Sequence, residues 1–231
     1  MALVLTAHRG SPDRAPENTL PAFAAAIAAG ADELELDLQV TTDDQLVVFH
    51  DQTVDRITDG TGPLADFSLA ELRELSVSGE RIATFEEVLD AVAGHPLQVE
   101  LKAPKAAARL AALLRARPEL EDQFRVNTGE TTWLADLHRL RPSTRLAYSA
   151  EGASTSLVDR AVGLGAEAVY LSLPDLTHEI VRYAHGRGLR ITGWLANTES
   201  DIERALDLGL DGVTTDYVSV VRPVIDRLLP V

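Results

Sequence analysis

Short apolar segments typical of buried strands alternate with amphipathic, helix-like segments along nearly all of the 231-residue chain. Such alternation favours a parallel sheet, because each helix carries the chain back to the start of the next strand. Eight units of this kind predict a closed α/β fold, the (β/α)8 TIM barrel. An open doubly wound sheet is the rival, but no G-x-G-x-x-G fingerprint supports it. The strands that we expect to run parallel are 3–7, 33–40, 97–102, 124–127, 145–148, 168–171, 189–195 and 212–215.

Helix signals separate these strands. Asn18 is predicted to cap the first helix, in which Pro21 is tolerated in the opening turn and which Gly30 ends. Ser68 and Thr84 each begin a capping box, and each box predicts a short helix. The longer helices are expected at 19–29, 104–115, 131–140, 154–164, 178–186, 199–208 and 219–229. We find no linker, so we expect residues 1–231 to form a single domain.

The stretch from Glu33 to Asp51 holds a predicted hairpin. Its first arm alternates leucines with Glu35 and Asp37, so both carboxylates are expected on one face of a strand. A polar turn at residues 41–45 leads into an apolar return arm at 46–49. This return arm would be antiparallel, and it would bring His50 back beside Asp37.

Composition limits the possible partners. The net charge is −15 and the pI is about 4.7, which argues against nucleic acid and against an anionic membrane surface. We find no run of 18 apolar residues and no signal peptide, so we expect no stable membrane insertion and a cytoplasmic location. The chain has no cysteine, which excludes disulfides and thiolate chemistry. The sequence makes no prediction of oligomeric state.

Three carboxylates are predicted to meet at the carboxyl ends of the strands, where such barrels place their active sites. Glu35 and Asp37 belong to the second strand and Glu100 to the third. Carboxylate oxygens without any thiolate favour a hard cation, Mg²⁺ or Ca²⁺, with Mn²⁺ as a further candidate. The competing interpretation is that each acid simply forms an ion pair with an arginine at the rim.

Other reactive side chains fall at the same strand ends. His8 and His50 flank the acids and are candidates for a general acid and a general base. Arg9 and Lys102 supply fixed positive charge suited to a phosphate, although both are also able to pair with the acids. Trp194 is either a wall for the carbon skeleton of a substrate or part of the core.

These residues carry a resemblance to a known family. The chain resembles the glycerophosphodiester phosphodiesterases in an ordered series of motifs that runs from position 8 to 216. The motifs are His8-Arg9-Gly10, Pro16-Glu17-Asn18-Thr19, Glu35-Leu36-Asp37, Thr41 with Asp43, His50-Asp51, Arg56 with Thr58, Glu100-Leu101-Lys102, Trp194 with Asn197, and Asp211-Gly212 with Thr215-Asp216. Two places depart from the family pattern, Arg56-Ile57-Thr58 and Trp194-Leu195-Ala196-Asn197.

The resemblance implies a TIM barrel with a small insertion after the second strand, at about residues 51–81. It implies a divalent metal at Glu35, Asp37 and Glu100, and His8 and His50 as the catalytic pair. Arg9 and Lys102 would then bind the phosphate. The implied activity is that of a phosphoric diester hydrolase, which splits a small-molecule glycerophosphodiester into sn-glycerol 3-phosphate and an alcohol.

Three alternatives remain at the level of sequence. The nearest is a lysophospholipase D-like or cyclising phosphodiesterase that acts on an acylated substrate. A second is a barrel that binds phosphate esters without turning them over. The presence of both histidines and all three acids argues against this alternative. A third is a metal-dependent aldolase or isomerase acting on a sugar phosphate, which would use a Lys or Glu base without two histidines.

Overall fold

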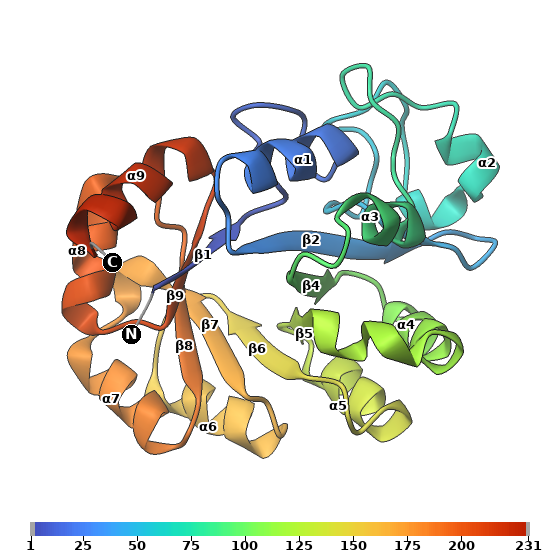
Figure 1. Ribbon diagram of the computed structural model, residues 1–231. Coiled ribbons are helices and arrows are strands. Elements are labelled where there is room, and N and C mark those ends of the chain that lie inside the picture. Colours follow the sequence, from blue (N-terminus) through green and yellow to red (C-terminus); the bar gives the residue numbers. More distant parts are fainter. Residues whose placement is uncertain (1–2, 230–231) are drawn as a thin grey trace.

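Eight parallel strands close into a barrel surrounded by helices (Figure 1). The structure, a computed structural model, describes residues 3–229. Pairing of the first strand with the second closes the sheet, so the predicted (β/α)8 barrel is confirmed and an open sheet is wrong. The barrel strands are β1 Val4–Ala7, β2 Glu33–Val40, β4 Leu97–Leu101, β5 Phe124–Thr128, β6 Leu146–Ala150, β7 Ala168–Ser172, β8 Arg190–Trp194 and β9 Gly212–Thr215.

Most helices begin and end within two residues of their expected positions. The ranges predicted for α5, α7 and α8 coincide with those observed, whereas α4 begins two residues late because Lys105 is its N-cap residue. Both capping boxes are present, and they open α2 and α3. The helices are α1 Leu20–Ala28, α2 Leu69–Leu72, α3 Phe85–Ala91, α4 Ala106–Ala116, α5 Thr131–Leu140, α6 Thr155–Gly163, α7 His178–Gly186, α8 Glu199–Leu208 and α9 Val218–Leu228, with short 3-10 turns at Leu64–Asp66, Pro118–Gln123 and Leu173–Asp175.

The prediction that Asn18 caps α1 is wrong. Thr19 is the N-cap residue, and its hydroxyl accepts a hydrogen bond from the Ala22 N–H. Asn18 adopts a left-handed conformation with φ of 59°, which Asn tolerates better than most residues. Its side-chain amide then donates to the Asp37 carboxylate at 2.8 Å. Both residues have capping chemistry, so sequence alone does not separate the cap from the neighbour that supports the site.

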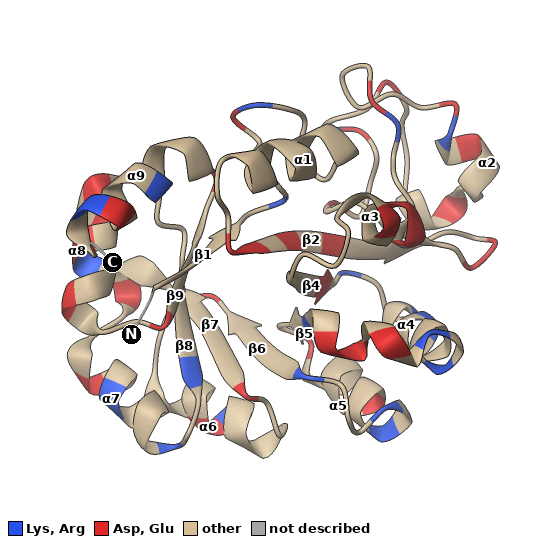
Figure 2. Cartoon of the chain, viewed as in Figure 1, with Lys and Arg blue, Asp and Glu red and all other residues tan. Residues whose placement is uncertain are grey.

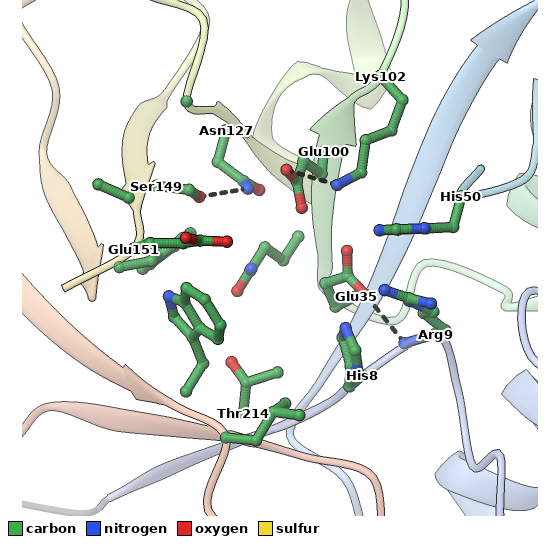
Figure 3. A pocket seen from close by; sticks show the side chains of 16 residues that line it. His8, Arg9, Glu35, His50, Glu100, Lys102, Asn127, Ser149, Glu151 and Thr214 are labelled. Carbon is green, nitrogen blue, oxygen red and sulfur yellow. Dashed lines mark hydrogen bonds and ion pairs between the residues drawn. The ribbon is translucent and has the colours of Figure 1, made fainter. Parts of the chain in front are cut away.

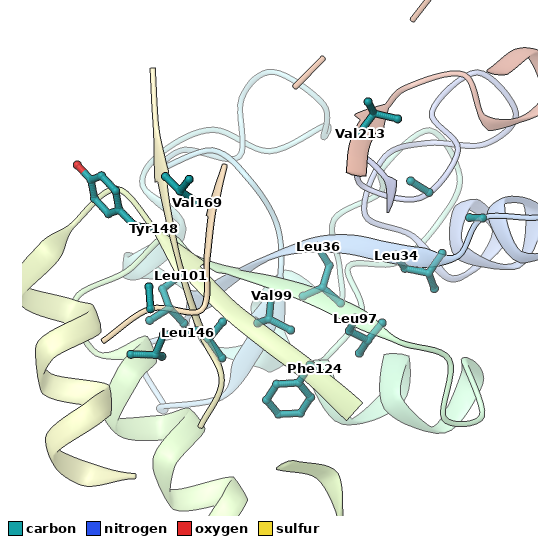
Figure 4. Close-up of a cluster of buried hydrophobic side chains, with 14 of the residues drawn as sticks. Leu34, Leu36, Leu97, Val99, Leu101, Phe124, Leu146, Tyr148, Val169 and Val213 are labelled. Atoms are coloured by element: carbon teal, nitrogen blue, oxygen red, sulfur yellow. The ribbon is translucent and has the colours of Figure 1, made fainter. Parts of the chain in front are cut away.

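The two faces of each barrel strand have opposite characters. On β2 and β4, Leu34, Leu36, Leu97 and Val99 are buried in the apolar layer between barrel and helices (Figure 4). The alternate residues of these strands face the barrel interior, and Figure 2 shows acidic bands along β2. The apolar layer therefore stabilises the fold, while many of the side chains that face the interior are polar.

Strand register sets the height of the interior side chains. Asp37 lies opposite Glu100 across β2 and β4, and Glu100 lies opposite Asn127 across β4 and β5. Further round, Trp194 on β8 pairs with Thr214 on β9. One ring of residues near the carboxyl ends therefore carries most of the polar groups described below.

The predicted hairpin is present, with β3 Leu46–Val48 antiparallel to β2. The segment predicted as an insertion, at about residues 51–81, follows it, and its apolar side chains form a small cluster together with Val47 and Phe49 of the return arm. This cluster includes Phe49, Val54, Leu64 and Ile82, all buried. The insertion is thus anchored to the return arm that carries His50.

Candidate active site

A cavity of about 350 Å³ opens at the carboxyl ends of the barrel strands. Within its walls the structure brings together nearly all of the site residues predicted from sequence, and Asp37 lies buried next to Glu35 and Glu100. Figure 3 shows His8, Arg9, Glu35, His50, Glu100 and Lys102 directed toward a common space. The predicted residues that line the cavity are His8, Arg9, Glu35, His50, Glu100, Lys102 and Trp194.

Glu35, Asp37 and Glu100 form a compact acid cluster. One carboxylate oxygen from each lies within 4.8 Å of the others. The strand register explains this, because Asp37 and Glu100 are directly paired and Glu35 lies two residues earlier on the same face of β2. Three adjacent carboxylates repel one another unless positive charge joins them.

Two buried oxygens of this cluster fit a metal ion. Glu35 accepts a hydrogen bond from the Arg9 backbone N–H through one oxygen, and Asp37 accepts one from Asn18 through one oxygen. In residues 3–229, the second oxygen of each, Glu35 Oε1 and Asp37 Oδ1, is buried and has no hydrogen-bond partner. Buried acceptors are rarely left unpaired, and an all-oxygen donor set suits a hard divalent cation.

Positive side chains partly balance the acids. Lys102 Nζ lies 2.8 Å from Glu100 Oε1 and 3.5 Å from Asp37 Oδ1. Arg9 Nε lies 3.4 Å from Asp37 Oδ2, and its Nη1 donates to Glu17. Arg9 holds φ at 52°, which aims its N–H at Glu35. The ion-pair interpretation is therefore correct for Lys102 and Arg9. Within residues 3–229, however, it leaves Glu35 Oε1 without a hydrogen-bond partner and gives Asp37 Oδ1 only the 3.5 Å contact with Lys102.

The acid cluster predicts an unusual pH dependence for the protein without cation. Burial and the neighbouring charge of Asp37 raise the pKa of Glu35 to about 8. The folded state therefore binds more protons than the unfolded chain between roughly pH 4.5 and pH 8. The free energy of unfolding should fall as pH rises through this window, which urea unfolding of metal-free protein will measure. Stability that rises between pH 5 and pH 8 would contradict this prediction.

Added cation should stabilise the fold at neutral pH. A ligand that binds only the folded state at about 100 times its Kd contributes about 2.7 kcal/mol. Thermal melts in EDTA, and with Mg²⁺, Ca²⁺ or Mn²⁺ in excess, will measure this effect. Glu35→Gln is the matched variant, since it keeps the side chain's size and removes a charge. No shift with any cation would count against a metal at this cluster.

His8 is held by a carboxylate from the last strand. Its Nδ1 lies 2.7 Å from Asp216 Oδ1, and Asn197 donates to the other oxygen of Asp216. Burial disfavours the charged imidazole, but the hydrogen bond to Asp216 and the charge of Glu35 outweigh it and raise the pKa of His8. Since Nδ1 faces Asp216, Nε2 is the nitrogen left for a substrate.

His50 has a matching arrangement. Its Nδ1 lies 2.6 Å from Asp51 Oδ1, and Arg56 contacts the second oxygen of Asp51. Arg56 also forms a bidentate pair of hydrogen bonds with the Glu17 carboxylate, which accepts a further hydrogen bond from Arg9. A continuous chain of charged groups thus links one imidazole to the arginine beside the acid cluster.

Arg56 is therefore expected to position His50. Arg56→Ala should lower kcat about tenfold by freeing Asp51 and His50, with little loss of stability because the side chain is half exposed. Arg56→Lys should not restore activity, since a single ammonium cannot serve Glu17 and Asp51 in the same geometry. Arg139→Ala, on the exposed face of α5, is the control. Normal turnover by folded Arg56→Ala would contradict this role.

Sequence reasoning missed one wall of the cavity. Gln98, Asn127, Ser149, Glu151 and Tyr170 line it, and none was predicted as a site residue. Asn127 stands at the carboxyl end of a predicted strand, which is the rule that found Glu100, so this signal was available. His138, His178 and His185 lie on the outer helices α5 and α7.

The comparisons with known proteins agree with this geometry. The model of the glycerophosphoryl diester phosphodiesterase family matches residues 8–220. Glycerophosphodiester phosphodiesterases of Caldanaerobacter subterraneus subsp. tengcongensis and Bacillus altitudinis are 29% and 30% identical to this chain. The first alignment covers 94% of this chain and 95% of the relative, and the second covers 91% and 93%. A solved phosphodiesterase of Oleispira antarctica, in complex with the product sn-glycerol-3-phosphate, has a TM-score of 0.88 at 25% identity, with 97% of each chain covered.

The barrel and its polar mouth define an enzyme of the TIM-barrel phosphodiesterase class. The chain belongs to the glycerophosphoryl diester phosphodiesterase family, as the motif series predicted. Across residues 3–229, no helix is both long and apolar enough to cross a membrane.

Proposed function

We propose that this enzyme hydrolyses glycerophosphodiesters to sn-glycerol 3-phosphate and an alcohol, with a divalent cation held by Glu35, Asp37 and Glu100. One observation carries the proposal: two imidazoles, each fixed by an aspartate, line the same cavity as the acid cluster. The product bound to the Oleispira antarctica phosphodiesterase supports this choice of product. A single domain is proposed to carry the whole reaction.

The phosphate is proposed to bind beside the acid cluster. Mg²⁺, Ca²⁺ or Mn²⁺ at this position would neutralise phosphate oxygens and act as a Lewis acid on phosphorus. The guanidinium of Arg9 and the ammonium of Lys102 lie next to the same point and add fixed positive charge. Burial opposes the charge of Lys102, yet Asp37 and Glu100 raise its pKa, so it is a cation at neutral pH.

The two histidines are proposed to move the protons. With each Nδ1 donating to an aspartate, each Nε2 is free to exchange a proton with the substrate. One imidazole takes the proton of the attacking hydroxyl, and the other returns a proton to the departing alkoxide. Asp216 and Asp51 keep the rings oriented and stabilise the imidazolium that forms.

Trp194 is proposed as an apolar wall of the cavity. It lines the opening and packs against the small interior cluster of Ala147, Ala168 and Tyr170. The two interpretations left open by the sequence are therefore both compatible with its position, because Trp194 is half-buried, packs against this cluster and also lines the cavity.

A substrate panel tests this function against its nearest rival. Purified protein should release sn-glycerol 3-phosphate from glycerophosphocholine or glycerophosphoethanolamine. Lysophosphatidylcholine, which carries an acyl chain on the same skeleton, should react at least about tenfold more slowly, because the acyl chain replaces a free glycerol hydroxyl in a cavity lined mostly by polar side chains. Faster turnover of the lysolipid would favour the lysophospholipase D-like alternative, and no turnover of either would reject both.

A further inference from the structure

The wall of the cavity away from His50 carries polar groups that the proposed chemistry does not use. Asn127, Ser149 and Glu151 project from the ends of β5 and β6, and Figure 3 shows them across the cavity from His50. Gln98 lies in the neighbouring position of β4, directly paired with Arg125. We call Gln98, Asn127 and Ser149 the polar floor.

Among the described residues, only one of the two polar atoms of the Asn127 side chain has a hydrogen-bond partner. Its side-chain NH₂ donates to Ser149 Oγ at 2.7 Å, and the residue is only 1% exposed. Its Oδ1 is buried and, among the described residues, has no hydrogen-bond partner. Whichever way the amide is turned, Ser149 satisfies one of its two polar atoms and the other is left for the cavity.

Gln98 supplies a second buried amide oxygen. It is 5% exposed, and within residues 3–229 its Oε1 is buried without a hydrogen-bond partner. Buried polar groups are nearly always hydrogen-bonded. We therefore expect a bound ligand to donate hydrogen bonds to these two amide oxygens. Such a ligand would satisfy the unpaired hydrogen-bond acceptors of both Asn127 and Gln98.

Buried polar contacts close the barrel beside Gln98 and below Asn127. Arg125, two residues before Asn127 on the same face of β5, is buried and donates to Tyr170 at 3.2 Å and to Glu167 at 2.6 Å. It also pairs with Glu33 on β2 at 3.6 Å. These contacts tie β2, β5 and β7 together, so the floor has no exit for a long chain.

We propose that the polar floor binds the free hydroxyls of the glycerol half of the substrate and thereby selects glycerol that is not acylated. The inference rests on the proposed function for the identity of the substrate. The phosphate site fixes one end of glycerol beside Glu35 and Glu100, and register places Asn127 next to Glu100. The half of the substrate that reaches the polar floor is then glycerol, which all glycerophosphodiesters share. The alcohol half, which varies between substrates, points to solvent.

Hydroxyls match this floor better than a cationic amine does. A hydroxyl both donates and accepts, so it can satisfy the unpartnered amide oxygens and also pair with the Ser149 hydroxyl. The quaternary ammonium of choline has no N–H and cannot donate to these oxygens, and the primary ammonium of ethanolamine cannot accept a hydrogen bond from Ser149. The cations Lys102 and Arg9 also line the same cavity. The amine-bearing head group of a substrate is thus expected outside the floor.

The kinetic test removes one hydroxyl far from phosphorus. Glycerophosphocholine is compared with the analogue that lacks only the terminal glycerol hydroxyl and keeps the one at C2. Wild-type kcat/KM should be at least about tenfold higher for the complete substrate. Asn127→Leu should lower kcat/KM about tenfold for the complete substrate and less than about threefold for the analogue. Ser149→Ala should act in the same direction, and Ser143→Ala, exposed and outside the cavity, is the control.

Equal turnover of the two substrates by the wild type would overturn the proposal, and this comparison needs no variant. So would an equal loss on both substrates in folded Asn127→Leu. A loss that follows the choline half, with ethanolamine and choline esters affected differently, would place the alcohol on the floor and would also overturn it.

Binding separates this inference from the reaction itself. Calorimetry with sn-glycerol 3-phosphate and with inorganic phosphate should show at least about tenfold weaker binding of the glycerol ester by Asn127→Leu, with phosphate unchanged. If Asn127→Leu weakens binding of the glycerol ester alone but no phosphodiester is hydrolysed, the role of the polar floor is supported and the proposed function is wrong. If phosphodiesters are hydrolysed but Asn127→Leu binds the glycerol ester as the wild type does, the role of the polar floor is wrong and the proposed function is supported.

Discussion

His8→Ala and His50→Ala are each expected to lower kcat by at least about 10²-fold, the low end for loss of a general acid or base. Each histidine is oriented by its own aspartate and lines the same cavity, so neither can take over the geometry of the other. Because the two act as a unit, the double variant should lose little more than the worse single one. Steady-state kinetics on glycerophosphocholine will measure the loss.

His138→Ala and His185→Ala are the matched controls. Both residues lie near the carboxyl ends of outer helices, and His185 pairs with Asp211 at the surface. These variants should behave like the wild type. Turnover within a few-fold of normal by folded His8→Ala or His50→Ala would remove that residue from the proton-transfer role.

A substrate without the C2 hydroxyl is expected to bind but not to react. That hydroxyl sits next to the phosphate, and a neighbouring nucleophile held in place has a high effective molarity. We therefore expect it to attack phosphorus first and to form a cyclic phosphate that water then opens. The 2-deoxy analogue should act as a competitive inhibitor whose turnover is at background.

The alternative is that water attacks phosphorus directly. Under this alternative the 2-deoxy analogue should turn over within about tenfold of the parent compound, and no cyclic phosphate should accumulate at early times. Phosphorus NMR of the first turnovers distinguishes the two routes, because it reports the cyclic ester separately from the final product. Near-normal turnover of the analogue would show that our preferred route is wrong.

The fold was predictable because its signals are local and repeat. Each parallel strand is apolar on the face that meets the helices, and side-chain N-caps open the longer helices α1, α6, α7 and α8. The capping boxes at Ser68 and Thr84 are complete within four residues, so no tertiary information was needed. Closure of the barrel is a long-range event, which only the pairing of β1 with β2 reveals.

The acid cluster was predictable for a related reason. Glu35 and Asp37 interrupt a leucine-rich strand with period two, and Glu100 stands at the matching point of the next parallel strand. Charged residues are poor choices inside strands, so their presence at adjacent strand ends indicates a site. The structure places them together as expected, whereas their role toward a metal stays a prediction.

The supporting contacts were not predictable, since they join distant residues. Asp216 holds His8 across 208 residues, and Arg56 reaches Glu17 across 39. Asn18 has the chemistry of a cap and instead supports Asp37. The motif series marks all of these residues, but it does not say which partner each one contacts, because pairing depends on closure of the barrel and on the path of the insertion.

Cation-dependent release of sn-glycerol 3-phosphate tests the central claim most directly. Purified protein, stripped of metal and then titrated with Mg²⁺, Ca²⁺ or Mn²⁺, is assayed on glycerophosphocholine, with Asp37→Asn as the matched variant. We expect background turnover in chelator, and at least one cation should restore activity to the wild type but not to Asp37→Asn. Full turnover in chelator, or no release of sn-glycerol 3-phosphate with any cation, would contradict a metal-dependent glycerophosphodiesterase.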